Sequence, residues 1–453
     1  MTLYPSSWTI RPSRIVRLDG QVRQDTSVRS ASSSLRLILA LASGGPGQRT
    51  FRSFRSERPI RRKEKSVTVA IGIPKGSTPG ESRVALVPSL TEKYVKLGAE
   101  LLLEHGAGEA AAFPDELYEH VTFCENLAEL SERAAVMLSV QPPNIEEIQL
   151  LHEGQVVVGY MNPHRHPEYA LAMRDRNITG FAMELLPRIT RAQSMDALTS
   201  QAAVAGYKAV LIAANMLGRF LPMLTTPAGT IRPAKVLVIG AGVAGLQAIA
   251  TAKRLGAIVE AYDVRKATAE QVKSLGARFV GLEVDATADG GYARELTAEE
   301  RETEKSMLAD HIASAEVVIT TAAIPGRDAP KLIFKEAVER MKYGSVIIDL
   351  AAATGGNCEL TVPGDEVVHA GIRILGPTNI PALLPVDASE LYARNLLNFV
   401  TLIVKEGELV LDWEDPIIHG SVLTHQRELH YELSIPATYE GALKQTLAQG
   451  GVK

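Results

Sequence analysis

A glycine triplet in the middle of the chain constrains the fold more than any other feature. Gly240, Gly242 and Gly245 directly follow the apolar run at residues 235–239 and precede a stretch with helical spacing. In such a strand–turn–helix unit the first glycine permits the tight turn, the second leaves room for a pyrophosphate, and the third lets the helix pack closely on the strand. The helix N-terminus directs unpaired N–H groups and a partial positive charge at the phosphates. The sequence therefore predicts a Rossmann-like domain that binds a dinucleotide.

An acidic residue at the end of the next predicted strand indicates which dinucleotide is bound. Asp263 follows residues 258–262, about 20 residues after the glycines, where a carboxylate accepts hydrogen bonds from a ribose diol. A 2′-phosphate there would meet like charge, so NAD is preferred over NADP, although the nearby Arg265 weakens this preference. The alternative is that the glycines form only a turn and that Asp263 caps a helix. The predicted cofactor-binding residues of this region are Gly240, Gly242, Val243, Ala244, Gly245, Asp263, Val264 and Arg265.

Strand and helix patterns alternate along most of the chain, which predicts an α/β fold of two Rossmann-like domains with parallel sheets. Residues 67–73 have the β-branched character of a buried strand, and residues 88–97 have helical spacing with Ser89 as N-cap and Gly98 at the end. We expect an N-terminal α/β domain at residues 67–190, completed by about 385–453, and an NAD(H)-binding domain at residues 191–384. Further strands are predicted at residues 101–103, 235–239, 258–262, 317–319, 345–348 and 372–375, and further helices at residues 243–255, 268–275 and 388–402.

Residues 1–65 differ from the rest of the chain, because they are rich in arginine and serine and poor in acids. Such a composition predicts a disordered extension. It fits an organelle transit peptide or, alternatively, an extension without function.

Composition argues against several classes of function. Aromatic residues make up 5% of the chain and the formal net charge is −4, whereas nucleic-acid binding uses a basic face and aromatic stacking platforms. Cys124 and Cys358 are too few and too far apart for a disulfide framework or a thiolate zinc site, which fits a reducing compartment. His164 and His166 lack an accompanying set of acidic or cysteine ligands. We therefore expect neither a nucleic-acid partner nor a metal site.

The nearest approach to a membrane span is at residues 202–223, which Lys208 interrupts and which carry Arg219 near their end. A spanning helix needs about 18 or more apolar residues in succession. We therefore expect a long buried helix here, and any role at a membrane would need another chain as the anchor.

Several motifs resemble the NAD(H)-binding component of the proton-translocating nicotinamide nucleotide transhydrogenases. The most specific are Ala-Gly-Leu-Gln-Ala-Ile-Ala-Thr-Ala-Lys-Arg-Leu-Gly-Ala at residues 244–257 and Met-Glu-Leu-Leu-Pro-Arg-Ile-Thr-Arg-Ala-Gln-Ser-Met-Asp at residues 183–196. Further matches lie at residues 74–76, 79–85, 324–326, 347–350, 355–358 and 395–399. The resemblance runs from about residue 67 to residue 402, and the last fifty residues match only loosely.

The resemblance implies a polar loop beside the nicotinamide, formed by Arg188, Gln193, Asp196 and Thr199. Gln193 is expected to reach toward the partner's nucleotide and to orient the two rings, with Arg188 and Asp196 as the other catalytic candidates. Thr199 replaces the usual serine of the family but keeps the hydroxyl group. The alternative is a helix N-terminus that Asp196 caps, beside a surface arginine.

A second implied feature is a flexible loop at residues 286–294 that closes over the nucleotide. Gly290 and Gly291 would supply hinge freedom, and Tyr292 would supply an amphipathic lid. The alternative is a surface turn ahead of an acidic helix.

Alanine dehydrogenases share this ancestry, and three substitutions distinguish them from this chain. Where alanine dehydrogenases hold a lysine, a histidine and an aspartate for their substrate, the alignment places Gln141, Asn162 and Ala353, and only Arg83 remains. Gln141 supplies no cation, Asn162 transfers no proton near neutral pH, and Ala353 has no carboxylate. A site without acid/base groups suits direct hydride transfer between two nicotinamide rings held about 3 to 3.5 Å apart with water excluded.

The resemblance therefore implies a proton-translocating, Re/Si-specific NAD(P) transhydrogenase. This chain would bind NAD(H) as a homodimer, NADP(H) would be bound on a partner subunit, and membrane-embedded subunits would couple hydride transfer to proton translocation. The location would be cytoplasmic, peripheral on the inner face of the bacterial plasma membrane. The alternatives are an NAD-dependent, alanine dehydrogenase-like amino-acid oxidoreductase and a non-catalytic NAD-binding protein.

Overall fold

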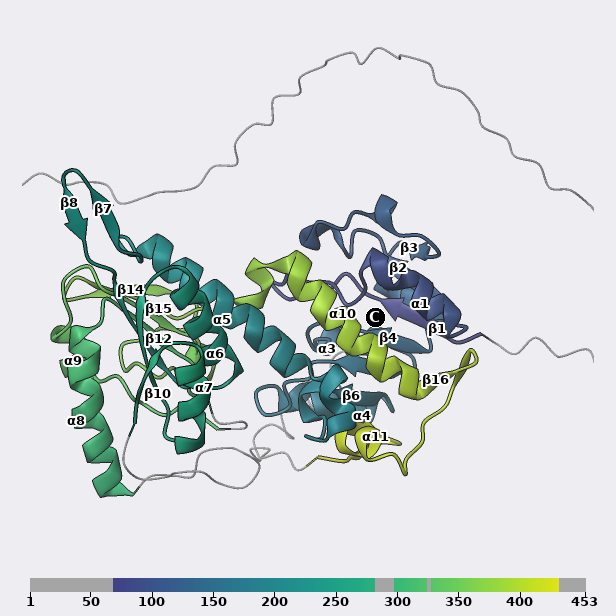
Figure 1. Cartoon of the computed structure of the whole chain (residues 1–453). Coiled ribbons are helices and arrows are strands. Elements are labelled where there is room, and N and C mark those ends of the chain that lie inside the picture. Colours follow the sequence, from purple (N-terminus) through teal and green to yellow (C-terminus); the bar gives the residue numbers. More distant parts are fainter. Residues whose placement is uncertain (1–67, 282–296, 324–326, 432–453) are drawn as a thin grey trace, which may run out of the picture. The chain divides into compact units, whose positions relative to one another are not determined.

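The computed structural model describes residues 68–281, 297–323 and 327–431. The expectations for residues 1–65, for the loop with Tyr292 and for residues 324–326 lie outside these ranges. The described residues form two large sheets with helices packed on them (Figure 1). The α/β class with Rossmann-like parallel sheets is confirmed.

The first sheet has eight strands in the order β19-β18-β6-β5-β4-β1-β2-β3. The strands from β3 to β6 are mutually parallel, and β18 and β19 add an antiparallel edge. Their bounds are β1 Ala70–Ile73, β2 Glu100–Glu104, β3 Thr122–Cys124, β4 Val136–Leu138, β5 Val156–Gly159, β6 Thr179–Ala182, β18 Val422–His425 and β19 Glu428–Leu429.

The second sheet has seven strands in the order β11-β10-β9-β12-β13-β15-β14. β9 pairs in parallel with β10 on one side and with β12 on the other, so the strand order reverses beside β9. Ligands of such sheets bind outside the carboxyl ends of the strands at this reversal. The bounds are β9 Lys235–Ile239, β10 Ile258–Tyr262, β11 Arg278–Val280, β12 Val317–Thr320, β13 Val346–Asp349, β14 Glu366–His369 and β15 Ile372–Leu375.

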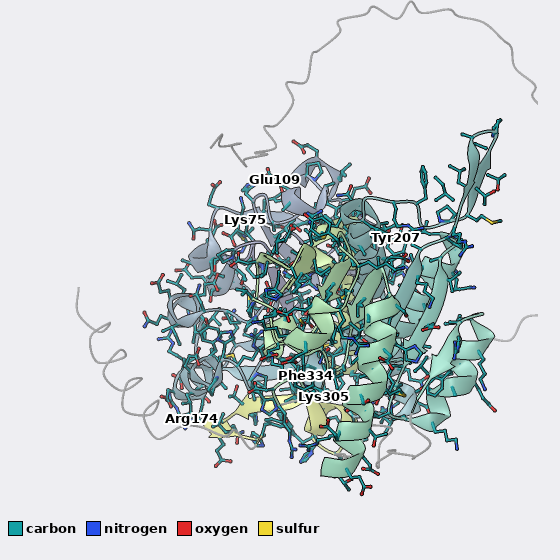
Figure 2. All side chains as sticks on the ribbon, turned by 90° about the vertical axis from the view of Figure 1, so that its left-hand side faces the viewer. Lys75, Glu109, Arg174, Tyr207, Lys305 and Phe334 are labelled. Atoms are coloured by element: carbon teal, nitrogen blue, oxygen red, sulfur yellow. The ribbon has the colours of Figure 1, made fainter. Side chains whose placement is uncertain are left out.

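Helices connect the strands, and two short hairpins complete the described elements. The helices are α1 Thr91–Lys96, α2 Leu127–Arg133, α3 Ile145–Leu150, α4 Pro167–Asp175, α5 Ala197–Met216, α6 Val243–Arg254, α7 Ala269–Ser274, α8 Ala298–Ser314, α9 Lys335–Glu339, α10 Pro385–Ile403 and α11 Pro416–Ser421. The hairpins are β7 Leu224–Thr226 with β8 Gly229–Ile231, and β16 Val404–Lys405 with β17 Glu408–Leu409. Lys305 of α8 lies 4.4 Å from the ring centroid of Phe334, just before α9, and this contact joins the two helices (Figure 2).

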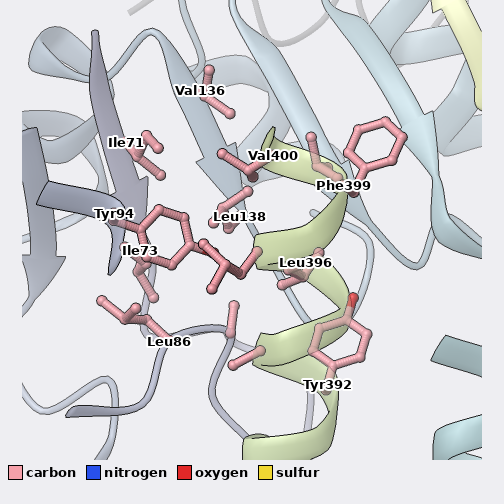
Figure 3. Packing of buried hydrophobic residues seen from close by; sticks show 14 of the residues in the cluster. Ile71, Ile73, Leu86, Tyr94, Val136, Leu138, Tyr392, Leu396, Phe399 and Val400 are labelled. Carbon is pink, nitrogen blue, oxygen red and sulfur yellow. The ribbon is translucent and has the colours of Figure 1, made fainter. Parts of the chain in front are cut away.

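Helix α10 completes the core of the first sheet although it is far from β1 in sequence. Leu396 and Val400 point toward Ile73 and Leu138, and all four side chains are buried (Figure 3). Phe399 of the same helix lies 5.4 Å, centroid to centroid, from Phe181 of β6. Each large apolar side chain buried in this way contributes about 1.5 to 3 kcal/mol. The core therefore fixes the position of α10, which carries polar groups toward the candidate site.

The prediction of Ser89 as an N-cap is wrong. Pro88 starts a short 3-10 turn, Pro88–Leu90, and α1 begins only after Leu90, which makes no side-chain capping bond. Proline pre-sets the backbone of a first turn and needs no N–H partner, so the turn forms without the serine hydroxyl. The expected end of the helix is confirmed, because Gly98 has a φ of +82° and a Cβ there would lie 2.8 Å from the nitrogen of Gly407.

Helix α5 begins five residues before the predicted buried helix and ends at Met216, where the chain turns into the exposed β7–β8 hairpin. Among the described residues it is the one helix long and apolar enough to cross a membrane, and 39% of that window is buried. Gly206 explains how closely it packs on α6, because a Cβ there would lie 2.1 Å from the carbonyl oxygen of Ala244. Such helix-on-helix packing is typical of a core helix.

Candidate functional site

The three glycines form a turn in which each position has a separate spatial role. Gly240 has a φ of +96°, and a Cβ there would lie 2.6 Å from the hydroxyl oxygen of Thr321. A Cβ at Gly242 would meet no atom within 4 Å, whereas a Cβ at Gly245 would lie 1.8 Å from the carbonyl oxygen of Gly240. The turn thus has a tight corner, an open middle and a close helix–strand contact. These are the features that a pyrophosphate-binding turn requires.

The N-terminus of α6 is free to receive an anion. Its N-cap is Gly242, no side chain of the described ranges caps it, and its first turn holds no acidic residue. Val243 is 42% exposed, so the first turn is open to solvent. Unpaired N–H groups and the helix dipole favour a phosphate at such an end.

Asp263 lies at the carboxyl end of β10 but is already paired. Its Oδ2 accepts a hydrogen bond from the backbone N–H of Ala241 at 2.7 Å, and its Oδ1 accepts one from the N–H of Arg265 at 2.8 Å. The Arg265 guanidinium also bonds both carboxylate oxygens, at 2.8 and 2.9 Å. The bonds to Asp263 raise the pKa of Arg265 above its ordinary value. The carboxylate is therefore buried, neutralised and tied to the glycine turn, and it is not the N-cap of the helix that follows.

Two buried polar residues that sequence reasoning left without a role hold the loops beside the turn. Asp349, at the end of β13, accepts hydrogen bonds from the hydroxyls of Thr320 and Thr361 at 2.8 and 2.7 Å, and from the N–H of Cys358 at 2.9 Å. Asn357 accepts from the N–H of Ala322 and donates to its carbonyl oxygen at 2.8 Å. Both lie in stretches that carry the family resemblance, and the position of Asp349 directly after an apolar strand was the available signal.

Two of the four residues expected in the polar loop, Asp196 and Thr199, lie at the N-terminus of α5, and Arg188 and Gln193 precede it in the chain. Asp196 is its N-cap, with Oδ1 accepting from the N–H of Thr199 at 2.9 Å and Oδ2 accepting from its hydroxyl at 2.6 Å. Gln193 lies in the preceding 3-10 segment, Thr190–Met195, and its side chain and that of Arg188 are exposed. Asp196 therefore does cap the helix, as the alternative proposed, and Gln193 remains accessible to a second molecule.

A cavity of about 50 Å³ lies beside Arg83 and Gln141, two of the positions at which the resemblance implies the substrate site of the dehydrogenases. The guanidinium of Arg83 bonds Glu81 at 2.6 and 2.8 Å and Gln201 at 2.8 Å. Gln141 also donates to Glu81, at 2.8 Å. Burial acts to raise the pKa of Glu81, but Arg83 and Gln141 outweigh it and hold that pKa below the ordinary value. The charge of Arg83 is thus already balanced by an internal carboxylate.

Asn162 and Ala353 form hydrogen bonds through their backbone groups, and neither has a side chain that could act as an acid or a base. Asn162 has a φ of +45°, and its N–H donates to Oε1 of Glu184. The carbonyl oxygen of Ala353 accepts a hydrogen bond from Arg165. His164 and His166 bond Tyr431 and Glu168. Within residues 68–281, 297–323 and 327–431, no three His, Cys, Asp or Glu side chains gather as metal ligands would.

Glu184 makes the stability of this region depend on pH. Its Oε1 accepts from the N–H groups of Met161 and Asn162, whereas Oε2 is buried without a hydrogen-bond partner among the described residues. Burial raises the pKa of Glu184 above its ordinary value of 4.5. The folded chain therefore keeps a proton that the unfolded chain releases, so the free energy of unfolding should fall as pH rises from 4.5 through the native pKa.

Substitution of Glu184 by Gln should remove this dependence. Above the native pKa the variant should be more stable than the unchanged chain by about 1 kcal/mol, because a neutral amide is cheaper to bury than a carboxylate. Urea unfolding from below pH 4.5 to neutral measures the effect, with the change for Glu184 above pH 4.5 and that for the control below it. Glu366→Gln is a control with the opposite pH dependence. The bond to Arg373 lowers the pKa of Glu366, so the stability that the ionised Glu366 contributes is lost as pH falls. Parallel pH curves for Glu184→Gln and the unchanged chain would contradict the assignment.

Two domain families of known proteins match this chain in tandem. Residues 72–205 match the alanine dehydrogenase/PNT N-terminal domain, and residues 209–432 match the C-terminal domain of the same family. The chain is 46% identical to the first portion of the NAD(P) transhydrogenase alpha subunit of Rhodospirillum rubrum over 367 residues, which cover 78% of this chain and 96% of that protein. The chain belongs to the NAD(P) transhydrogenase alpha-subunit family. The resemblance seen in the sequence is thereby confirmed.

Structural similarity agrees with this family. A solved transhydrogenase structure from Sinorhizobium meliloti shares a TM-score of 0.70 and 42% identity, covering 80% of this chain and 98% of that one. Alanine dehydrogenase of Bacillus subtilis is 31% identical over 379 residues, which cover 80% of this chain and 93% of that protein. Nucleotide binding by the transhydrogenase alpha-subunit family agrees with the glycine turn and the free N-terminus of α6.

Proposed function

We propose that this chain is the NAD(H)-binding subunit of a proton-translocating NAD(P) transhydrogenase. The observation that carries the proposal is the pairing of an open phosphate turn at Gly242 with Gln141, Asn162 and Ala353 at the three positions where the dehydrogenases hold a lysine, a histidine and an aspartate. Gln141 and the backbone at Asn162 and Ala353 serve structural hydrogen bonds instead. A pocket of this kind is suited to aligning two cofactors and not to processing a metabolite.

Nucleotide binding in this proposal uses three regions of the chain. The turn at Gly240, Gly242 and Gly245, with Val243 and Ala244 at the start of α6, receives the pyrophosphate. Asp263, with Val264 and Arg265, lies toward the adenosine ribose, and a buried acid there favours NAD(H) over NADP(H). The bidentate contact with Arg265 weakens that preference, because it balances the charge that would repel a 2′-phosphate.

At the other end of the nucleotide, Arg188, Gln193, Asp196 and Thr199 surround the nicotinamide. NADH supplies the hydride, and NADP⁺ on the partner subunit receives it. The chain itself orients the ring: the cap between Asp196 and Thr199 fixes the start of α5, and the exposed Gln193 contacts the second nucleotide. No residue of the loop has to exchange a proton with the reacting carbons.

The partners of the proposal are a second copy of this chain, an NADP(H)-binding subunit and membrane-embedded subunits that couple transfer to proton translocation. The β7–β8 hairpin supports the homodimer, since all residues of both strands are exposed and Met223, Leu224 and Ile231 are 64%, 37% and 43% exposed. Exposed apolar groups in one place mark protein interaction sites. The proposed location is the cytoplasmic face of the bacterial plasma membrane, through the partner subunits.

A mixing assay tests the function. The purified chain is combined with the NADP(H)-binding component of a transhydrogenase, NADPH and an oxidised NAD analogue whose reduced form has a distinct absorbance. Reduction of the analogue should require both proteins. NADH formation from NAD⁺ and L-alanine by this chain alone would instead establish the dehydrogenase alternative. NADH binding without transfer in the mixture would establish the non-catalytic alternative.

Gln193→Asn should slow this transfer about tenfold, because the shorter side chain no longer reaches the second nucleotide and small errors of alignment are costly. NADH affinity, measured by fluorescence titration, should be nearly unchanged. Ser194→Ala is the control, because Ser194 is the exposed neighbour of Gln193 in the same 3-10 segment. An unchanged rate for Gln193→Asn would refute the role given to Gln193.

A further inference from the structure

The backbone beside Gln193 is held by two asparagine side chains that lie slightly more than two hundred residues further along the chain, in helix α10. Asn395 and Asn398 of α10 each donate from Nδ2 to the carbonyl oxygen of Ser194, both at 2.9 Å. Asn395 also accepts from the hydroxyl of Ser200 at 2.7 Å, which ties the first turn of α5 to the same helix. One peptide group next to Gln193 is therefore fixed from two points.

A second contact restrains the other side of Gln193. The guanidinium of Arg191 forms a two-point ion pair with Asp415, with one N–O distance of 2.9 Å. Asp415 is itself fixed, because its Oδ1 accepts from the N–H of Ile417 as the N-cap of α11. Burial acts to raise the pKa of Asp415, but Arg191 and Ile417 outweigh it and keep that pKa below the ordinary value. The ion pair thus persists at neutral pH.

The bonds from Asn395, Asn398 and Asp415 are not required to attach the segment around Gln193 to the core. Ala192 and Met195 already anchor the segment in the core of the first sheet, and Leu396 and Phe399 anchor α10 in the same core. The carbonyl of Ser194 belongs to an exposed residue, so water could satisfy it without a side-chain donor. It nevertheless accepts from two asparagines, both next to the exposed side chain that is proposed to meet the second nucleotide. A 3-10 segment has poor internal hydrogen-bond geometry and does not hold such a backbone rigid by itself.

We propose that Asn395 and Asn398 are positioning residues that hold the backbone at Ser194 and thereby align Gln193 for hydride transfer. The proposal rests on the function proposed above. Asn398 is half-buried and Asn395 is buried. Asn398 is therefore the better residue to change without disturbing the core.

The test compares Asn398→Ala and Asn398→Asp with the unchanged full chain in the mixing assay. Both variants lose the donor to Ser194, and the aspartate keeps the shape but places a repelling oxygen there. At saturating nucleotide the transfer rate should fall about tenfold in each, because loosened alignment acts on the reacting geometry. KM for the NAD analogue, NADH affinity and the thermal unfolding midpoint should stay unchanged. Thr401→Ala is the matched control, since its hydroxyl bonds the carbonyl of Asn398 within the same helix and, among the described residues, no group of the loop around Gln193.

The outcomes separate this proposal from the function on which it rests. If the unchanged chain transfers hydride and the Asn398 variants transfer it equally fast, the alignment role is overturned and the function stands. If rate, affinity and unfolding midpoint fall together, the asparagines are structural and the proposal is again overturned. If the unchanged chain fails to transfer with the NADP(H)-binding component, both proposals fail.

Discussion

A methyl group at position 245 should abolish nucleotide binding, because its Cβ would lie 1.8 Å from the carbonyl oxygen of Gly240. Neither atom can move away cheaply. Gly240 is pressed against Thr321, whose hydroxyl donates to that same carbonyl at 3.0 Å, and Gly245 is part of α6. Gly245→Ala should therefore force β9 and α6 apart and destabilise the fold by about 3 kcal/mol or more. NADH affinity should fall by more than about 100-fold, since the turn no longer directs its N–H groups at the phosphates.

Gly242→Ala provides the contrast that tells binding from folding. Gly242 has a φ of −76°, which alanine adopts without strain, and a Cβ there meets no atom within 4 Å. The variant should fold with an unchanged thermal midpoint but lose NADH affinity about 100-fold, because the methyl group fills the space of the pyrophosphate. Calorimetric titration and thermal unfolding of both variants measure the difference. Tight NADH binding by Gly242→Ala would mean that the phosphates bind elsewhere.

Asp263→Asn should cost stability and selectivity together. The buried carboxylate balances the Arg265 guanidinium and accepts the N–H of Ala241, so its neutral replacement leaves one charge and one donor poorly satisfied. We expect a loss of about 2 to 3 kcal/mol in the free energy of unfolding, less than for a fully buried pair, because the Arg265 side chain is 23% exposed. The ratio of NADPH to NADH dissociation constants should decrease, since a 2′-phosphate no longer meets an acid.

Arg265→Ala should act on selectivity in the opposite direction. It leaves Asp263 with the N–H groups of Ala241 and residue 265, and it frees acceptor capacity for a ribose diol. The negative charge is then unbalanced, so NADPH should bind more weakly relative to NADH than in the unchanged chain. Urea unfolding and paired titrations with NADH and NADPH measure both variants. Selectivity that is identical in all three proteins would remove Asp263 from the ribose site.

Sequence reasoning located the elements best where a short local pattern decides the structure. The predicted strands at residues 235–239, 258–262 and 372–375 coincide with β9, β10 and β15, because β-branched runs end there at glycines or turns. It failed at Ser89, where Pro88 starts a separate turn. For α5 the apolar pattern placed the start five residues too late, whereas the alternative interpretation of Asp196 as a helix cap placed it correctly. Local apolar periodicity does not indicate which polar residue closes a helix end.

The candidate site was predictable in its glycines and less so in its polar contacts. The roles of Gly240, Gly242 and Gly245 follow from backbone geometry, which the spacing encodes. The ion pair between Asp263 and Arg265 depends on side-chain conformation, and the sequence indicated only that an arginine lies nearby. The contacts of Asn395 and Asn398 depend on the return of α10 to the first sheet. The sequence therefore showed that these asparagines belong to a family motif, but it did not indicate that they bond the carbonyl of Ser194.

Helix α5 sets a fixed distance within the candidate site. Its N-cap, Asp196, belongs to the polar loop, and Gly206, further along, touches Ala244 at the start of α6. At a rise of about 1.5 Å per residue these points lie about 15 Å apart along one rigid rod. If the chain binds NAD(H) as proposed, the helix sets the distance between the groups that contact the two halves of the dinucleotide. An inserted residue between Asp196 and Gly206 would lengthen this segment by about 1.5 Å and rotate one end relative to the other by about 100°.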